Sequence, residues 1–163
     1  MIVFRPTRAF AASHPAHLIA FGFGAGLSPW APGTVGTLVA WPIGWFFAAA
    51  YPPPVSLGVI ALLFLVGVWA CGVTGRRLGV HDHHGMVWDE IVAFLLILVV
   101  LPRSFAWQAA GFVAFRFFDI LKPAPIRWFE RRYPGGFGVM FDDLLAAGYA
   151  LLALAIVKRA WSL

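Results

Sequence analysis

Long apolar runs separated by short polar segments dominate the pattern of this chain of 163 residues. Five runs stand out, at residues 35–51, 55–74, 91–101, 105–121 and 144–157. A helix needs about 20 residues to cross the hydrocarbon core of a bilayer, so 55–74 would span alone, whereas 91–101 and 105–121 are short. We expect the two short runs to span as a helical hairpin over 102–104, or else to form a re-entrant pair.

The composition strengthens the membrane interpretation. The chain is 61% hydrophobic and 12% charged, and no Asp, Glu, Lys or Arg occurs from Ala9 to Gly75. A water-soluble fold could not stay dispersed with such a stretch, which predicts an integral membrane protein. We therefore expect a single all-α domain over 1–163, a polytopic membrane helix bundle of about five spans. A glycine-rich piece at 17–27 would form a re-entrant or interfacial segment before the first span.

The net charge of +5 indicates membrane topology, because the basic residues flank apolar runs and do not form the single stripe typical of nucleic-acid binding. With the N-terminus in the cytoplasm, five spans place six basic residues inside: Arg76, Arg77, Lys122, Arg127, Arg131 and Arg132. Lys158 and Arg159 then lie outside, against the positive-inside rule. This orientation brings four polar segments to one cytoplasmic end of the bundle: 28–37, 81–90, 116–122 and 135–143.

The carboxylates are gathered in one part of the chain. All seven acidic residues fall between Asp82 and Asp143, and five stand at the ends of apolar runs: Asp89, Glu90, Asp119, Asp142 and Asp143. A carboxylate at the centre of a membrane helix costs roughly 2.5–3.5 kcal/mol, so the cluster indicates a cation site and, through the cation, an anionic substrate. Neighbouring Asp89 and Glu90 point about 100° apart on a helix, so one could bind the metal while the other orients it. The alternative is that Asp89 and Asp142 only cap helices.

Glycines and prolines break the helical pattern at 26–37, where Thr34 or Thr37 could cap the span that follows. Free N–H groups at that helix start, beside Gly33 and Gly36, could bind a phosphate; a plain turn is the alternative.

Histidines open the segment HDHHGMVWDE at 81–90. His81 and His83 could act as metal ligands or as a general acid or base, or could lie solvated in a loop.

Arg116, Asp119 and Lys122 are spaced i, i+3, i+6, which predicts one helix face. Such a row suits a site that holds a metal and a phosphate, with the carboxylate on the metal and the cations on phosphate oxygens. A structural Arg–Asp pair is the alternative, which explains Arg116 and Asp119 well and Lys122 less well.

Four blocks, GFGAGLSPWAPGTVGTL (22–38), HDHHGMVWDE (81–90), FRFFDILKPAPIRWFERR (115–132) and GGFGVMFDDLLAAG (135–148), resemble the phosphatidylglycerophosphatase A family of bacterial membrane lipid phosphatases. The resemblance implies Mg²⁺-dependent removal of the terminal phosphate from phosphatidylglycerophosphate. The product, phosphatidylglycerol, would be made at the cytoplasmic face of the bacterial inner membrane.

On this hypothesis, five carboxylates supply the ligands for one or two Mg²⁺ ions: Asp89, Glu90, Asp119, Asp142 and Asp143. Arg116 and Lys122 would neutralise charge on the phosphoryl oxygens, and the turn with Gly33, Thr34, Gly36 and Thr37 would cradle the phosphate. His81 or His83 could protonate the leaving glycerol oxygen. The nucleophile and the oligomeric state stay open. A proton- or metal-coupled membrane transporter is the alternative, because intramembrane carboxylates also mark ion paths.

Overall fold

Prolines and glycines mark where the long helices begin and end. The computed structural model describes residues 6–161, and the regular structure of that part is helical throughout. Pro32 and Pro53 lie in the first turn of α3 (Pro32–Ala50) and α4 (Pro53–Leu78), where a missing N–H removes no helical bond. Gly79 ends α4 in the left-handed conformation, with φ of 72°.

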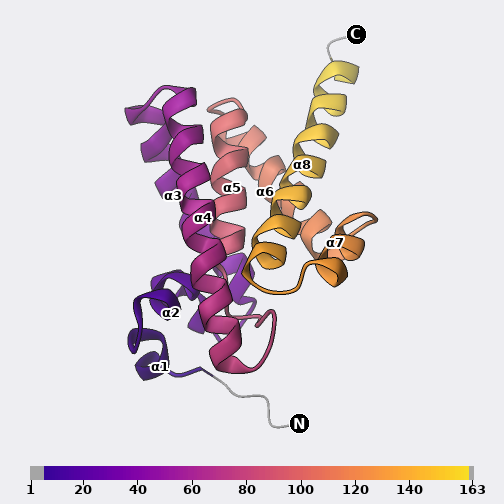
Figure 1. The fold of residues 1–163 in the computed structure, drawn as a ribbon. Coiled ribbons are helices and arrows are strands. Elements are labelled where there is room, and N and C mark those ends of the chain that lie inside the picture. Colours follow the sequence, from indigo (N-terminus) through magenta and orange to yellow (C-terminus); the bar gives the residue numbers. More distant parts are fainter. Residues whose placement is uncertain (1–5, 162–163) are drawn as a thin grey trace.

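The other long helices are α5 (Trp88–Val100), α6 (Phe105–Leu121) and α8 (Gly136–Trp161). Short elements connect or precede them: α1 (Arg8–Ala12), α2 (Pro15–Ala20), the 3-10 segment η1 (Gly22–Leu27) and α7 (Ile126–Arg132). Figure 1 shows α3, α4, α5 and α6 running together as a bundle. Helix α8 leans away from α4, and α7 lies against the first half of α8.

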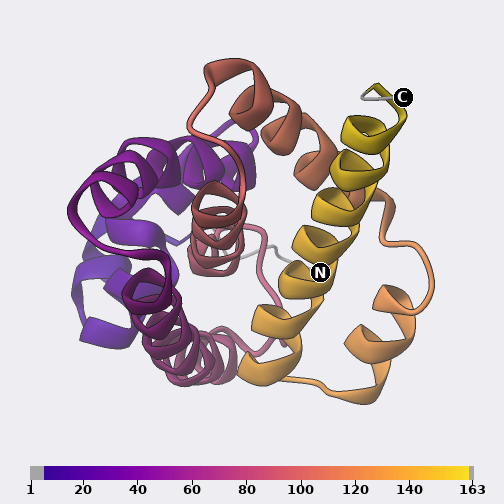
Figure 2. The same cartoon turned by 90° about the horizontal axis from the view of Figure 1, so that it is seen from above.

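The short helix α5 is the centre of the bundle, with α3, α4, α6 and α8 around it (Figure 2). Nine of its 13 residues are buried, including Phe94, Ile97 and Leu98. An apolar run of this length is typical of a core helix, which needs no lipid contact along its sides. The neighbours of α5 therefore fix where its first turn lies.

The predicted all-α bundle is confirmed, and the two helices of the described part that are long and apolar enough to cross a membrane are α4 and α8. Five spans therefore remain a prediction. The boundaries of α6 are those predicted, but α8 begins at Gly136, not near residue 144. Residues 136–143, which precede the predicted run at 144–157, are therefore helical, and Gly136 at the start of the helix packs directly on the backbone of Gly72 in α4.

The N-terminal segment packs beside the lower end of α4 and does not extend along the bundle (Figure 1). It also holds the loop that leads into α5. The N–H of Val87 donates to the carbonyl of Ala20 at 2.8 Å, and Gly26 lies so close to the Gly85 carbonyl that a side chain would collide with it. These contacts fix the loop from Gly85 to Val87, and with it the start of α5.

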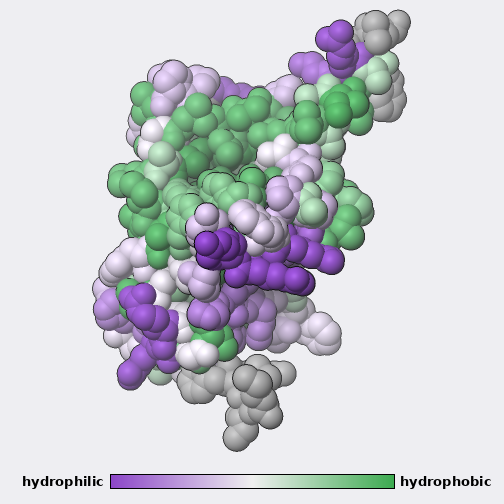
Figure 3. Space-filling view, turned by 45° about the vertical axis from the view of Figure 1, so that its right-hand side comes forward, coloured by the Kyte–Doolittle hydropathy of each residue, from purple (hydrophilic) through white to green (hydrophobic). Residues whose placement is uncertain are grey.

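The surface separates into apolar and polar zones (Figure 3). Hydrophobic side chains cover the upper part of the bundle, and hydrophilic ones gather below them and again at the far end of α8. Exposed apolar residues such as Leu62, Leu65 and Ile156 belong to the two helices that are long enough to span. This distribution is what a protein embedded in a bilayer requires.

A buried glutamine joins α3 to α6 inside the apolar zone. The Oε1 atom of Gln108 accepts hydrogen bonds from the indole N–H groups of Trp41 at 2.9 Å and Trp45 at 2.6 Å. Because lipid offers no hydrogen bonds, these two donors depend on Gln108. Trp41 also stacks on Phe105 and Phe112 of α6, so polar and aromatic contacts hold the same pair of helices.

We expect Gln108→Leu to lower the free energy of unfolding in detergent by about 1–3 kcal/mol, because both indole groups lose their acceptor. Unfolding followed by circular dichroism measures the loss. Trp45→Phe, made in the wild type and in the Gln108→Leu background, completes a double-mutant cycle. Equal costs of Trp45→Phe in the two backgrounds would show that the hydrogen bond contributes nothing.

Candidate active site

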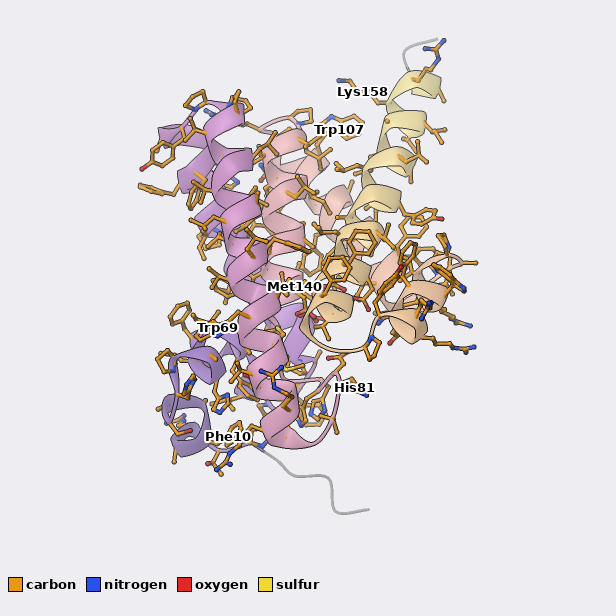
Figure 4. The ribbon with its side chains drawn as sticks, viewed as in Figure 1. Phe10, Trp69, His81, Trp107, Met140 and Lys158 are labelled. Atoms are coloured by element: carbon orange, nitrogen blue, oxygen red, sulfur yellow. The ribbon has the colours of Figure 1, made fainter. Side chains whose placement is uncertain are left out.

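Three carboxylates meet where α5 and α8 begin. Asp89, Glu90 and Asp143 each offer one oxygen, and these oxygens lie within 4.8 Å of one another. Asp89 and Asp143 are buried and Glu90 is half-buried. We call these three residues the acidic cluster. In Figure 4, Met140 marks the first part of α8, just before the acidic residues of that helix.

Helix capping does not account for these carboxylates. The N-cap position of α5 is Val87, and α8 begins six residues before Asp142, so the capping alternative is wrong for both helices. Asp89 and Glu90 lie in the first turn of α5, where the helix dipole favours negative charge. Adjacent positions on α5 were expected to diverge, but the structure brings both side chains into the cluster.

Two oxygen atoms of the cluster are buried without a hydrogen-bond partner among the described residues. They are Oε2 of Glu90 and Oδ2 of Asp143. A buried carboxylate oxygen without a partner is costly, and several carboxylates together repel one another. A divalent cation with oxygen ligands would relieve both costs, so the donor set fits Mg²⁺ by its chemistry.

Arg116 of α6 lies between the cluster and a fourth carboxylate. Its Nη1 is 2.7 Å from Oδ2 of Asp119 and 3.5 Å from Oε1 of Glu90. The predicted pairing of Arg116 with Asp119 along the helix is confirmed. Two carboxylates thus contact one guanidinium, and with Asp89 and Asp143 close to Glu90 the site keeps a negative charge that a cation can balance.

The first turn of α3 lies directly against Glu90 and Arg116. Gly33 is buried, and a Cβ at that position would overlap Oε1 of Glu90 and stand 3.1 Å from Nη1 of Arg116. Gly36, one turn later, also packs closely, since a Cβ there would stand 2.8 Å from the Cβ of Val87, just before α5. The two glycines therefore allow the N-terminus of α3, with its free N–H groups, to approach the carboxylates and the guanidinium.

The expected threonine cap of α3 is wrong. Pro32 starts the helix, the N-cap position is Ala31 in a left-handed conformation, and no side chain caps it. Thr37 is buried and its hydroxyl donates to the Gly33 carbonyl at 2.8 Å, while Thr34 is half-buried in the first turn. Left-handed backbone at a non-glycine residue is strained, and such strain is concentrated at functional sites.

Lys122 pairs with carboxylates outside the acidic cluster. It ends α6 with φ of 44°, so its side chain leaves the helix face that carries Arg116 and Asp119, and the predicted three-residue row is not formed. Its Nζ lies 2.6 Å from Oδ2 of Asp142 and 3.1 Å from Oε1 of Glu130. Burial disfavours the charged ammonium, but Asp142 and Glu130 outweigh burial and raise the pKa of Lys122 above its ordinary value.

The histidines lie beside the acidic cluster and not in it. His83 is buried, and its Nδ1 accepts from the N–H of Gly85 at 3.0 Å. His81 is exposed (Figure 4) and lines an open cavity of about 390 Å³ together with Asp82, Arg131 and Asp142. Sequence patterns gave no sign of this cavity, because α7 and the start of α8 create it by packing together.

Buried carboxylates, a guanidinium and a helix N-terminus around one point define a site for a cation and an anionic group, set in an apolar helix bundle. The sequence profile of the family described as Phosphatidylglycerophosphatase A matches residues 18–158. The chain belongs to this family, and with two helices long enough to span it is a membrane-associated protein.

Two relatives carry the family name. The phosphatidylglycerophosphatase A of Escherichia coli strain K12 is 43% identical over 152 residues, which cover 93% of this chain and 88% of the relative. That of Haemophilus influenzae is 42% identical over 154 residues, which cover 94% of each chain. No solved structure matches the chain.

The contact at Gly33 gives a direct test of the site. We expect Gly33→Ala to lower phosphate release at least about tenfold, because the added Cβ must displace Glu90 or Arg116. Gly148→Ala in α8 is the matched control, since a Cβ there meets no atom within 4 Å. Equal activity of the two variants, measured as phosphate released per minute, would remove Gly33 from the site.

Proposed function

We propose that the protein hydrolyses the terminal phosphate of phosphatidylglycerophosphate to give phosphatidylglycerol and inorganic phosphate. Membership of a phosphatase family over residues 18–158 supports this function. The observation that carries it is the contact of Arg116 and the first turn of α3 with the acidic cluster. A position for a cation and a position for an anion therefore adjoin, as hydrolysis of a phosphate monoester requires.

The acidic cluster would hold Mg²⁺ through Asp89, Glu90 and Asp143, with Asp119 beside them as a further ligand. Bound there, Mg²⁺ would polarise the phosphoryl group and favour ionisation of water. Asp142 is a ligand only if it leaves Lys122, to which it is bound at 2.6 Å. We therefore assign the Lys122–Asp142 pair a positioning role at the edge of the site.

The phosphate would be bound by Arg116 and by the start of α3. Negative charge on the phosphoryl oxygens would be balanced by the guanidinium, and N–H groups near Gly33 and Thr34 would donate to them, as helix N-termini do in many anion sites. Gly36 and Thr37 support that turn, Gly36 by close packing on Val87 and Thr37 through its bond to the Gly33 carbonyl.

The leaving glycerol oxygen would face the cavity beside Asp142. His81 lines that cavity, whereas the Nδ1 of His83 is bonded to the loop backbone. His81 is therefore the better candidate to protonate the leaving group. The loop containing His83 would act by fixing the start of α5.

An apolar groove supports a lipid substrate. Leu57, Phe64 and Leu65 of α4, Leu96 of α5 and Leu144 of α8 line an open space of about 360 Å³. Leu144 follows Asp143 directly, and Leu96 is six residues, or about 9 Å, along α5 from Glu90. An acyl chain of the substrate would lie here while its terminal phosphate lies at the acidic cluster.

The end of the bundle that carries the acidic cluster would face the cytoplasm in a multi-pass protein of the bacterial inner membrane. Arg76 and Arg77 end α4 near it, and Arg131 and Arg132 end α7. The Arg103 loop lies at the opposite end. This distribution follows the positive-inside rule, with Lys158 and Arg159 at the far end of α8 as the exception.

The decisive experiment measures phosphate release by the purified protein from phosphatidylglycerophosphate, phosphatidic acid and a lysolipid phosphate, with Mg²⁺ and after chelation by EDTA. We expect release to be greatest from phosphatidylglycerophosphate and to fall at least about a hundredfold on chelation, because the carboxylates alone cannot bind the phosphate. Release that is unchanged by EDTA would refute the metal assignment.

Transport would be tested on the same preparation. The carboxylates named above lie at one end of the bundle, whereas a transporter needs access to its site from both sides. Ion flux into proteoliposomes without phosphate release would replace the phosphatase proposal.

A further inference from the structure

A second polar pocket, separate from the acidic cluster, lies between α2 and α4. It has a volume of about 540 Å³, and six residues line it: Ser13, His14, His17, Val73, Arg76 and Arg77. Five of the six are polar, four carry a cation or an imidazole, and none is acidic. The proposed hydrolysis uses none of them.

Among the residues that the structure describes, the two arginines have no carboxylate partner. Within the described residues, neither Arg76 nor Arg77 lies within 4.0 Å of an acidic side chain. Both stand in the last turn of α4 and are exposed. Their positive charge is therefore directed into the pocket and the solvent around it, where an anion can reach it.

The imidazoles are fixed in place. Nδ1 of His17 is 2.9 Å from the hydroxyl of Thr74 in α4, and Nδ1 of His14 accepts from the N–H of Ala16 at 3.1 Å. The rings of His14 and His17 lie 5.3 Å apart. Burial, and then the charges of His14 and Arg77, lower the pKa of His17, which favours the neutral form of this hydrogen-bonded ring.

Because α4 is long enough to span a bilayer, its end, and the pocket with it, would lie at a membrane surface. Trp69, which is half exposed on α4, packs near His14 at 6.2 Å between ring centres, and tryptophan is enriched at lipid head-group level (Figure 4). Arg76 and Arg77 follow two turns later, where the candidate spanning helix ends. Lipid phosphates occupy this layer of a bilayer.

We propose that this pocket binds a phosphate group, carried by an anionic phospholipid of the adjacent leaflet. Arg76 and Arg77 balance its charge, and His14 orients it by a hydrogen bond from the ring nitrogen that does not bond Ala16. The alternative is that the two arginines only set the membrane topology through the positive-inside rule. That explanation does not account for the buried His17–Thr74 contact or for the absence of acidic residues from the lining of the pocket. The bound lipid would join α2 to the end of α4.

The test is native mass spectrometry of the detergent-purified protein with phosphatidylglycerol, with phosphatidylcholine as the uncharged comparison. We expect the double variant Arg76→Gln/Arg77→Gln to bind phosphatidylglycerol at least about tenfold more weakly. Ser13→Trp, which fills the exposed side of the pocket without changing charge, should weaken binding to a similar extent. Circular dichroism verifies that both variants fold.

Lys158→Gln/Arg159→Gln is the matched control, because it removes the same charge at the far end of α8. Equal weakening of lipid binding in the control and in the arginine variant would overturn the proposal in favour of general charge attraction. Unchanged lipid binding in both pocket variants would also overturn the proposal. Asp143→Asn should keep the lipid, which separates this pocket from the acidic cluster. Competition by inorganic phosphate would identify the phosphate itself as the ligand; retention of lipid in its presence would identify the membrane-bound head group.

Discussion

Asp143→Asn is expected to lower phosphate release at least about a hundredfold and to leave the metal-free protein as stable as the wild type, or more stable. Asp143 is buried, one of its oxygens has no partner, and its carboxylate faces those of Asp89 and Glu90. Replacing it by an amide of the same shape removes one of several repelling charges. The same change removes a metal ligand, so activity and stability should move in opposite directions.

Two measurements on one preparation test this expectation. The free energy of unfolding, obtained from thermal unfolding in detergent, should increase when Mg²⁺ is added to the wild type. The increase should be about 2.7 kcal/mol at a Mg²⁺ concentration a hundred times the dissociation constant, and the variant should show no increase. Glu130→Gln is the control for the metal response: this carboxylate is exposed, pairs with Lys122 and lies outside the acidic cluster, so stabilisation by Mg²⁺ should stay as in the wild type. Normal activity of Asp143→Asn would exclude the acidic cluster as the metal site.

Sequence patterns predicted the positions of the long helices well, but they misplaced the start of α8. The run at 105–121 matches α6, because Ser104 and Lys122 are polar residues at real helix ends. The start of α8 was misplaced by eight residues because Asp142 and Asp143 resemble the end of a membrane span. They lie inside the helix, since the protein buries them in the site, and Gly136 is helical because it packs against α4.

The candidate site was predictable as a place but not as a set of contacts. Topology alone brought the start of α3, the loop before α5, the end of α6 and the start of α8 to one end of the bundle, and the contacts of Gly33, Glu90, Arg116 and Asp143 confirm it. Spacing could not reveal that Lys122 turns away to Asp142, because that depends on a left-handed residue. Nor could it reveal the contact of Gly33 with Glu90, which only tertiary packing creates.

Arg116→Gln is expected to have the opposite effect on stability from Asp143→Asn. Arg116 is the cation that contacts Glu90 and Asp119, so without it the carboxylates repel one another unopposed. The metal-free protein should lose about 1.5–3 kcal/mol of its free energy of unfolding, as for a hydrogen bond to a charged group. Stabilisation by Mg²⁺ should then exceed that of the wild type, because the cation supplies the charge that the arginine no longer provides.

Phosphate release by Arg116→Gln should nevertheless fall about a hundred- to a thousandfold, since the guanidinium binds the anion and Mg²⁺ cannot replace it there. Arg116→Lys serves as the comparison: it keeps the charge, so stability should largely return, but the planar two-pronged donor is lost and activity should stay low.

A smaller response to Mg²⁺ in Arg116→Gln than in the wild type would mean that the guanidinium helps to bind the metal and does not substitute for it. In Asp143→Asn a ligand is removed and the metal response disappears, whereas in Arg116→Gln a competing cation is removed and the response grows, although both variants lose activity. Only a site in which the guanidinium and the metal share the same carboxylates gives that pair of results.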